Sequence, residues 1–466
     1  MTTSVRMLIA SFAVLLLLIF PYWIWHAYEN AGYTAGDFIN YAMKRLDGHP
    51  RLGAFALPVL ADFGSWLGYS TGHKQSVDLF IVPIPPPLFI DPDFKVLPTP
   101  TNTQQPHILR VGPSRSIQNI AQAAMLAHDG DVIEIDAGIY HGDVAVWNQK
   151  TLTIRGVGGN ARLFSEGLSA EGKAIWVIHN GSFNIENIDF IGAHVPDRNG
   201  AGIRFEGGIL HVHHCLFYGN ENGLLTSDNG QSELDISNSE FAYNGAGDGY
   251  SHDLYVGKIH SLKVTGSYFH HANVGHLFKS RAEFNDITYN RLTDEDGGRA
   301  SYELDIPDGG VAHIIGNIIQ QSQETENSTI IAYGEEGYSW STNEIYLASN
   351  TVVNDLPNGG TFLRVAPGAV NGVSTNNFLV GHGVFSVPPS VVSVNDIPTG
   401  WDIFVLAQRQ DYRLNASARK FRFETPTALI APDINLIPQA EYFHPMQTRT
   451  LPAPPTFPGA LQTMVH

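Results

Sequence analysis

The feature that most constrains this fold is a repeat of apolar segments, which recurs along the middle of the chain at intervals of 23 to 33 residues. A repeat of this length matches one coil of a solenoid, in which neighbouring coils bury each other's apolar faces. Equivalent residues then lie in columns with a spacing of about 4.8 Å. The segments end at Phe190, Phe217, Phe241, Phe269, Leu292, Ile319, Val352 and Leu379. The repeat therefore predicts stacked coils of short parallel strands.

A second column, two residues before each segment end, indicates how the coils are held in register. Most of its members are small or polar, and the last four are asparagines. Stacked side-chain amides hydrogen-bond along such a column and satisfy backbone groups at the turns. The column is Ile188, Cys215, Ser239, Ser267, Asn290, Asn317, Asn350 and Asn377. We interpret Cys215, the one cysteine of the chain, as a buried packing residue.

The beginning of the repeat has a signature of its own. Ser116 is placed to cap a helix that runs to about His128, and residues 129–131, Asp-Gly-Asp, then turn the chain into strands. This run, of the form SIQ.A...A..GD.I.I..G.Y, resembles the closing helix of the right-handed parallel β-helix proteins of the pectin-lyase-like group. The resemblance covers about residues 107–385. It implies an all-β, right-handed parallel β-helix of about ten coils with an N-terminal capping helix.

The chain outside the repeat predicts three further regions. Residues 1–26 contain an uncharged apolar run, Met7 to Trp25, that is long enough for one transmembrane helix, with a cleaved signal peptide as the alternative. Residues 27–106 form a juxtamembrane region with a proline-rich spacer, and residues 386–466 form a C-terminal capping tail. Arg6 precedes the apolar run, which favours a cytoplasmic N-terminus. The β-helix would then lie outside the cytoplasm, in the periplasm if the cell is Gram-negative.

Composition limits the classes of partner that this chain can bind. Its formal net charge is −18, which argues against nucleic acid because phosphate contacts need a basic surface. Hydrophobic residues make up 43% of the chain, which is ample for a core, and glycine is plentiful with 46 residues. Many short strands and turns fit this composition.

Reactive side chains concentrate between Gly247 and Gly310. Three short segments centred on leucine recur there, and each leucine lies 15 residues before the next segment end. If these leucines point inward, alternation turns the residues on either side of them outward. The first outward column is Asp253, His276 and Glu303, and the second is Tyr255, Phe278 and Asp305.

The coil that contains His276, Lys279 and Arg281 is rich in basic residues and lies between two acidic coils. The β-elimination of a uronate needs a base, cations that stabilise the developing charge, and an acid for the leaving oxygen. His276 and Lys279 are the candidate bases, and Arg281 is the candidate charge stabiliser. Tyr255 and Tyr302 are the candidate acids. The pattern thus predicts a site for elimination chemistry on the outer face of the coils.

The carboxylates of the same stretch allow three other interpretations. Asp253 and Glu303 lie two coils apart, roughly 9 to 10 Å, near the carboxyl separation of ~6.5–9.5 Å in inverting glycosidases. Asp248, Asp253, Glu303 and Asp305 could instead hold Ca²⁺, the one cofactor that the sequence indicates. In the third interpretation, the basic residues only neutralise the neighbouring carboxylates in surface ion pairs.

The segment that begins at Lys279-Ser280 and continues to Asn290 resembles the Lys-Ser segment of the alginate and chondroitin lyase family. That family has a catalytic arginine on the following coil, where this chain has Glu303-Leu304-Asp305. We therefore predict a membrane-anchored, extracytoplasmic, carbohydrate-active protein, either a polysaccharide lyase or a glycoside hydrolase. The alternative is a non-catalytic β-helix of the cell envelope that binds glycan or is structural.

Overall fold

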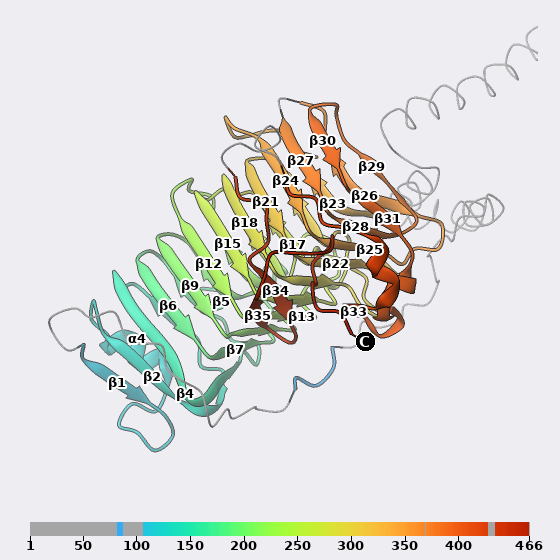
Figure 1. Cartoon of the computed structure of the whole chain (residues 1–466). Helices are drawn as coiled ribbons and strands as arrows, with labels where there is room; N and C mark the ends of the chain where they lie inside the picture. The colour runs from blue at the N-terminus through green and yellow to red at the C-terminus, as the bar shows by residue number, and fades with distance from the viewer. Residues whose placement is uncertain (1–81, 87–105, 369, 427–433, 466) are drawn as a thin grey trace, which may run out of the picture. The chain divides into compact units, whose positions relative to one another are not determined.

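A computed structural model describes residues 82–86, 106–368, 370–426 and 434–465 of the chain. Its strands stack in parallel, one coil above the next, and confirm the predicted parallel β-helix (Figure 1). The predicted membrane helix within residues 1–26 and most of the proline-rich spacer lie outside the described residues. Within the described ranges, no helix is both long and apolar enough to cross a membrane.

Each coil contributes strands to three stacks, which we name sheet B, the A stack and the C stack. Sheet B has ten strands, one from each coil. Its strands are β3 (Ala145–Trp147), β5 (Ala174–Ile178), β8 (Ala201–Phe205), β11 (Asn222–Thr226), β14 (Leu254–Val256), β17 (Phe278–Ser280), β20 (Leu304–Ile306), β23 (Thr329–Tyr333), β26 (Gly360–Val365) and β29 (Gly383–Ser386).

The A and C stacks are joined into one 21-stranded sheet, because the long strand β4 pairs with β6 through its first half and with β7 through its second half. The A stack is β1 (Ile108–Val111), β2 (Val132–His141), β4 (Thr151–Phe164), β6 (Ser182–Glu186), β9 (Ile209–His213), β12 (Glu233–Ser237), β15 (Ser261–Thr265), β18 (Phe284–Thr288), β21 (Val311–Ile315), β24 (Glu344–Ala348), β27 (Asn371–Thr375) and β30 (Val391–Val394). The C stack is β7 (Ile188–Ile191), β10 (Leu216–Tyr218), β13 (Glu240–Ala242), β16 (Tyr268–His270), β19 (Arg291–Thr293), β22 (Ile318–Gln321), β25 (Thr351–Asn354), β28 (Phe378–Gly381) and β31 (Ile397–Thr399).

The predicted column of segment ends is confirmed in the C stack. Phe217 pairs with Phe190 on one side and with Phe241 on the other, and Phe269 pairs with Leu292 on the next coil. All five side chains are fully buried. The rings of the four phenylalanines stack, with neighbouring centroids 4.4 to 5.1 Å apart. Each such contact adds about 0.5–1.5 kcal/mol beyond burial, which helps to hold the coils in register.

The predicted asparagine ladder is confirmed as well. The backbone N–H and Nδ2 of Asn290 donate to Oδ1 of Asn317 at 2.8 and 3.1 Å. Asn317 donates in the same way to Asn350, which donates to Asn377. Two serines continue the ladder to the backbone of Cys215, whose side chain is 1% exposed. Burial raises the pKa of the Cys215 thiol, as expected for a packing residue.

The N-terminal helix is shorter than the sequence predicts. Helix α4 spans Ile120–Leu126, and the side chain of Asn119 caps it. The predicted cap at Ser116 is wrong, because Ile117 still pairs with Val111 in a β-bridge and the helix begins only at Ile120. The buried side of α4 belongs to the core of the first coils, so the helix covers this end of the solenoid (Figure 1).

Beyond β31 the chain forms a C-terminal tail of short elements. These are η1 (Trp401–Ile403), β32 (Phe404–Leu406), η2 (Ala407–Arg409), β33 (Asp411–Leu414), η3 (Ala416–Lys420), β34 (Ala440–Phe443) and β35 (Gln447–Thr450). Strands β32 and β33 pair in antiparallel fashion, and so do β34 and β35. Ile403 and Tyr412 of the tail pack on Ile318, Val353 and Phe378 of the C stack, in a second apolar core. The tail therefore lies along the outer face of the C stack.

Candidate functional site

Sheet B brings predicted site residues together, in a register that differs by one residue from the prediction. Phe278, not Leu277, pairs with the inward leucine of β14, and Lys279 pairs with both Tyr255 and Asp305. Three residues, 281–283, connect β17 to the A stack, whereas four residues, 257–260, do so on the coil before. A slip of one residue moves every side chain to the other face. The outward column is therefore Tyr255, Lys279 and Asp305.

The predicted hydrolytic pair, Asp253 and Glu303, is wrong, because both side chains are fully buried. The register places them in one column with Leu277 and Ile330, which belong to the apolar core. Oδ1 of Asp253 accepts hydrogen bonds from the backbone N–H and Nδ2 of Asn244, at 3.2 and 2.8 Å. Asp253 thus supports a turn inside the solenoid, and neither carboxylate can reach a polysaccharide on the outer face.

The residues predicted to hold Ca²⁺ do not fit a shared site. Asp305 lies in the outward column of sheet B, whereas Asp253 and Glu303 are buried among core residues. Asp248 lies in a loop, where its Oδ1 accepts from the backbone N–H of Tyr250 at 3.0 Å. Among the residues that the structure describes, no group of three or more His, Cys, Asp and Glu side chains is arranged to hold a metal ion.

The outer face of sheet B carries a network of ion pairs, which we name the charged cluster. It consists of three cations and three carboxylates: Lys258, Lys279, Arg281, Asp305, Asp308 and Glu336. Nζ of Lys279 lies 3.3 Å from Asp305 and 3.1 Å from Glu336. Nη2 of Arg281 lies 2.7 Å from the other oxygen of Glu336. The basic residues thus form ion pairs with the neighbouring carboxylates, as the third interpretation predicts. These pairs, however, are mostly buried.

Exposure is uneven within the charged cluster. Lys279, Asp305 and Asp308 are each 8% exposed or less, whereas the side chain of Glu336 is 49% exposed. Burial raises the pKa of Asp305 to about 6, although Lys279 acts against this shift. Partial burial acts in the same sense on Glu336, but hydrogen bonds from Arg281 and Lys279 hold the pKa of Glu336 below its usual value. Glu336 is therefore ionised, and it is the most accessible of the three carboxylates in the charged cluster.

Two of the predicted catalytic residues lie beside Asp305. Nδ1 of His276 is 3.2 Å from Oδ2 of Asp305, and the His276 side chain is 8% exposed. The ring of Tyr302 contacts the imidazole of His276 edge to face, with centroids 4.9 Å apart. Burial raises the pKa of Tyr302, which keeps the phenol protonated. The structure therefore brings His276, Lys279, Arg281, Asp305, Tyr255 and Tyr302 to one part of sheet B and leaves out Asp253 and Glu303.

The loop that carries Glu336 covers one side of the charged cluster. It runs from residue 334 to residue 343, between β23 and β24 (Glu344–Ala348). Nε1 of Trp340 donates to the backbone carbonyl of Arg281 at 3.1 Å. Gly334 and Gly337 flank Glu335 and Glu336, and their φ angles of 77° and 107° favour glycine. Sequence spacing does not identify Lys279 as the partner of Glu336, because the two residues lie 57 positions apart.

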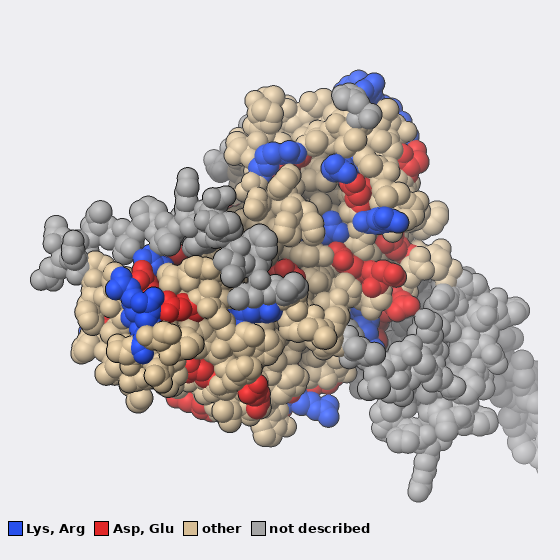
Figure 2. Space-filling model, turned by 90° about the horizontal axis from the view of Figure 1, so that it is seen from below, with Lys and Arg blue, Asp and Glu red and all other residues tan. Residues whose placement is uncertain are grey.

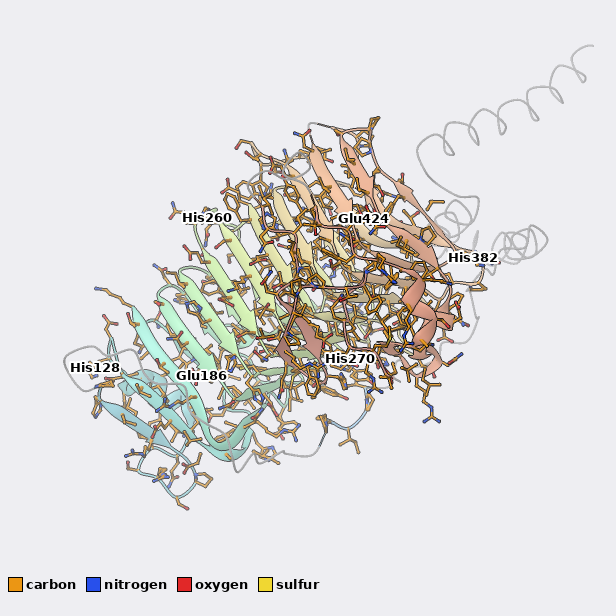
Figure 3. The ribbon with its side chains drawn as sticks, viewed as in Figure 1. His128, Glu186, His260, His270, His382 and Glu424 are labelled. Atoms are coloured by element: carbon orange, nitrogen blue, oxygen red, sulfur yellow. The ribbon has the colours of Figure 1, made fainter. Side chains whose placement is uncertain are left out.

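Sequence reasoning also missed a cavity of about 670 Å³ between the C stack and the C-terminal tail. Its floor includes Tyr268, Arg291 and Glu295, and its other walls come from the tail. Figure 3 shows the nearby His270 at the lower edge of the solenoid and His260 at the opposite edge. The histidine-rich stretch of the sequence therefore does not converge on one site.

Acidic and basic side chains are interspersed on the face seen in Figure 2. The protein-family comparison found no matching model, and no curated protein matches the chain. Among solved structures, the crystal structure of pectate lyase Pel9A aligns with 77% of this chain and 97% of that chain, at 13% identity and a TM-score of 0.44. A likeness this weak carries no argument about activity. The strand pairing itself shows that the chain is a parallel β-helix.

Proposed function

We propose that this chain is a carbohydrate-active protein that binds an acidic polysaccharide at the charged cluster. The observation that carries the proposal is the way in which Glu336 is held. One of its oxygens lies 3.1 Å from Lys279, and the other lies 2.7 Å from Arg281. Two cations that each bind one oxygen of the same carboxylate form a carboxylate-binding site. The carboxylate of a uronate has the same charge and shape, so it fits the same pair once Glu336 has moved away.

The charge balance of the cluster supports an anionic ligand. With Glu336 in place, three cations face three carboxylates. Without Glu336, three cations face only Asp305 and Asp308, which leaves a local excess of positive charge. An excess of this kind attracts a polyanion locally, even though the formal net charge of the chain is −18.

The same residues supply the parts of a β-elimination. Lys279 and Arg281 neutralise the uronate carboxylate, which makes the neighbouring C–H more acidic. His276, whose Nδ1 lies 3.2 Å from Asp305, takes that proton, and the electron pair forms a C=C bond as the glycosidic C–O bond breaks. A tyrosine donates the proton that the leaving oxygen needs. Tyr255 and Tyr302 are the candidates, because the ammonium of Lys279 lies 5.9 Å from the Tyr255 ring centroid and the Tyr302 ring contacts His276.

The test is an assay of the full-length protein on polygalacturonate and alginate, which follows the ultraviolet absorbance of unsaturated products together with reducing ends. We expect both signals, and we expect Lys279→Ala and His276→Gln to lose both while their circular dichroism spectra show that they remain folded. Reducing ends without absorbance would contradict elimination. Silence on both substrates, with neither of them retained by the protein, would contradict the proposed function.

A second candidate function is glycan binding without turnover. The specific observation in its favour is the cavity beside the C-terminal tail, which is built from fixed polar groups and aromatic rings. Binding of a neutral or acidic polysaccharide with no product in either assay would make this candidate the better account.

We also propose that the apolar run Met7 to Trp25 anchors the protein, with the β-helix outside the cytoplasm. The uncharged composition of the run supports this placement. Cell fractionation with protease treatment of intact spheroplasts tests it. Degradation of the β-helix from outside is expected, and full protection in intact spheroplasts would contradict the placement.

A further inference from the structure

The polar cavity beside the C-terminal tail is separate from the charged cluster, and the reaction proposed above does not use it. We propose that this cavity is a second binding site and that its ligand is an uncharged saccharide unit. The proposal rests on how the cavity is formed, on the fixed hydrogen bonds of its floor, on its charge balance and on its aromatic rings.

The cavity exists because the tail contacts the C stack at two separate places. The apolar contact of the tail reaches Ile318 on β22. The turn between β34 and β35 makes a separate contact farther along the stack, where Nδ2 of Asn238 donates to the carbonyl of Met446 at 2.7 Å. The outward column between these contacts holds Arg291 and Tyr268. The space above them is about 670 Å³, within the range of about 300–1,000 Å³ of small-molecule sites.

The floor of the cavity is fixed by hydrogen bonds. Arg291 is 9% exposed, and its Nη2 lies 3.1 Å from Glu295 and 2.7 Å from Oε1 of Gln410. Its Nε donates to Thr293 at 3.0 Å. The phenol of Tyr268 donates to the same carboxylate oxygen of Glu295. A floor held in this way is organised before a ligand arrives, which lowers the cost of binding.

The charges that line the cavity cancel. Four arginines and four carboxylates line it: Arg291, Arg409, Arg413, Arg449, Glu295, Asp296, Asp411 and Glu441. Three of the arginines are paired within the lining, with Glu295, Asp411 and Glu441 respectively. The remaining arginine and the remaining carboxylate also balance. A charged ligand therefore gains no net attraction, whereas hydroxyl groups can both donate and accept here.

The histidines of the lining do not change this balance. Burial lowers the pKa of His271 to about 4, and the neighbouring His270 acts in the same sense. Burial also lowers the pKa of His444. Both imidazoles are therefore neutral at physiological pH, so neither adds a positive charge to the lining of the cavity.

The aromatic lining suits the apolar face of a sugar ring. Tyr442 and Phe443 come from β34, and Tyr268 lies on the floor. The Phe443 side chain is 47% exposed, and the guanidinium of Arg449 lies 5.4 Å from its ring centroid. Aromatic faces next to mixed donors and acceptors, without a net charge, favour a neutral sugar over a uronate or a nucleotide.

The test is calorimetric titration of the full-length protein with cellohexaose, xylohexaose and mannohexaose. Phe443→Ala removes the exposed ring, and Gln408→Trp fills the cavity from the tail. Phe284→Ala is the matched control, because Phe284 lies on β18, outside the cavity lining, and is 42% exposed. Circular dichroism and the melting temperature of each variant show whether it is folded.

We expect at least one of the three oligosaccharides to bind. Phe443→Ala should weaken this binding about fivefold, Gln408→Trp should abolish it, and Phe284→Ala should leave it unchanged. The proposal is overturned if none of the three binds, or if binding is the same in the wild-type protein and in Phe443→Ala. Because the probes are neutral, the outcome is independent of whether the charged cluster binds polyuronate.

Discussion

Asp294 gives the sharpest test of how this solenoid tolerates buried carboxyl groups. The residue is fully buried, and its Oδ1 accepts from the backbone N–H of Ala300 at 3.0 Å. Its Oδ2 lies 2.8 Å from Oγ of Ser322, which is also 2.7 Å from the carbonyl of Gly298. The hydroxyl has one hydrogen, and a carbonyl can only accept. With Asp294 ionised, Ser322 can donate to only one of these two acceptors at a time, whereas a protonated Asp294 donates to Ser322 and leaves the hydroxyl hydrogen for Gly298.

The size of the effect on the free energy of unfolding follows from the pKa of the Asp294 carboxyl group. Burial raises the pKa of Asp294 from 3.8 to about 7. A shift of about 3 units corresponds to about 4 kcal/mol. Below the unfolded pKa, both states hold the proton, so the group does not affect stability. Between the two pKa values only the unfolded chain releases the proton, so the free energy of unfolding falls as pH rises. Above the folded pKa, the full deficit of about 4 kcal/mol remains.

The perturbation is Asp294→Asn, because asparagine keeps the acceptor for Ala300 and its Nδ2 donates to Ser322. We expect the free energy of unfolding of the wild-type protein to fall by about 4 kcal/mol more than that of the variant between about pH 4 and pH 8. For a domain of this size, that difference is on the order of 5 °C in melting temperature. The assay is calorimetric melting across this pH range.

The control for this prediction is Asp235→Asn, which changes an aspartate on β12 whose side chain is 36% exposed. Its melting temperature should follow the pH dependence of the wild-type protein. If Asp294→Asn also runs parallel to the wild type at every pH, the inference of a protonated carboxyl group is refuted.

Three further predictions concern the core. Glu303→Leu should raise the free energy of unfolding at neutral pH by about 2 kcal/mol, because neither buried oxygen of Glu303 has a hydrogen-bond partner among the described residues; a lower melting temperature would contradict this. Asn317→Ala should cost about 2–4 kcal/mol in urea unfolding, since it leaves the amide and backbone donors of Asn290 without an acceptor; a loss below about 0.5 kcal/mol would show that the ladder is dispensable. The buried thiol of Cys215 should react with a disulfide reagent only after unfolding, and fast reaction of the folded protein would contradict its packing role.

The sequence predicted the C stack well because apolar size and side-chain chemistry both mark its register. Large apolar residues such as Phe217 and Phe241 recur at one position of each coil, and the asparagines recur two residues earlier. Two independent columns leave no room for a slip of one residue. Cys215 was placed correctly for the same reason, since it lies within the second column.

Sheet B was harder to predict, because Leu277 and Phe278 are adjacent and both are apolar. Either of them can point inward, and the length of the next connection decides between them. The buried Asp253 and Glu303 were also misplaced, since acidic residues are normally assigned to the surface. Neither error is visible from composition or spacing alone.

Contacts between distant parts of the chain were beyond sequence reasoning altogether. Glu336 reaches the charged cluster from a loop that belongs to another coil, and Gln410 reaches Arg291 from 119 residues away. Such contacts depend on how loops and the tail fold back over the coils, and no local periodicity encodes them. The site residues predicted from sequence therefore included Lys279 and Arg281 but not Glu336, the carboxylate with which both of them pair.

The most direct test of the central claim is the affinity of the full-length protein for a uronate hexasaccharide, measured by calorimetry for the wild type, Glu336→Gln and Glu335→Gln. Glu335 is the matched control, because it lies next to Glu336 in the same loop but makes no ion pair with Lys279 or Arg281. If Glu336 occupies the ligand's place, Glu336→Gln should bind about tenfold more tightly, and Glu335→Gln should stay within about twofold of the wild type. Equal or weaker binding by Glu336→Gln would contradict the account.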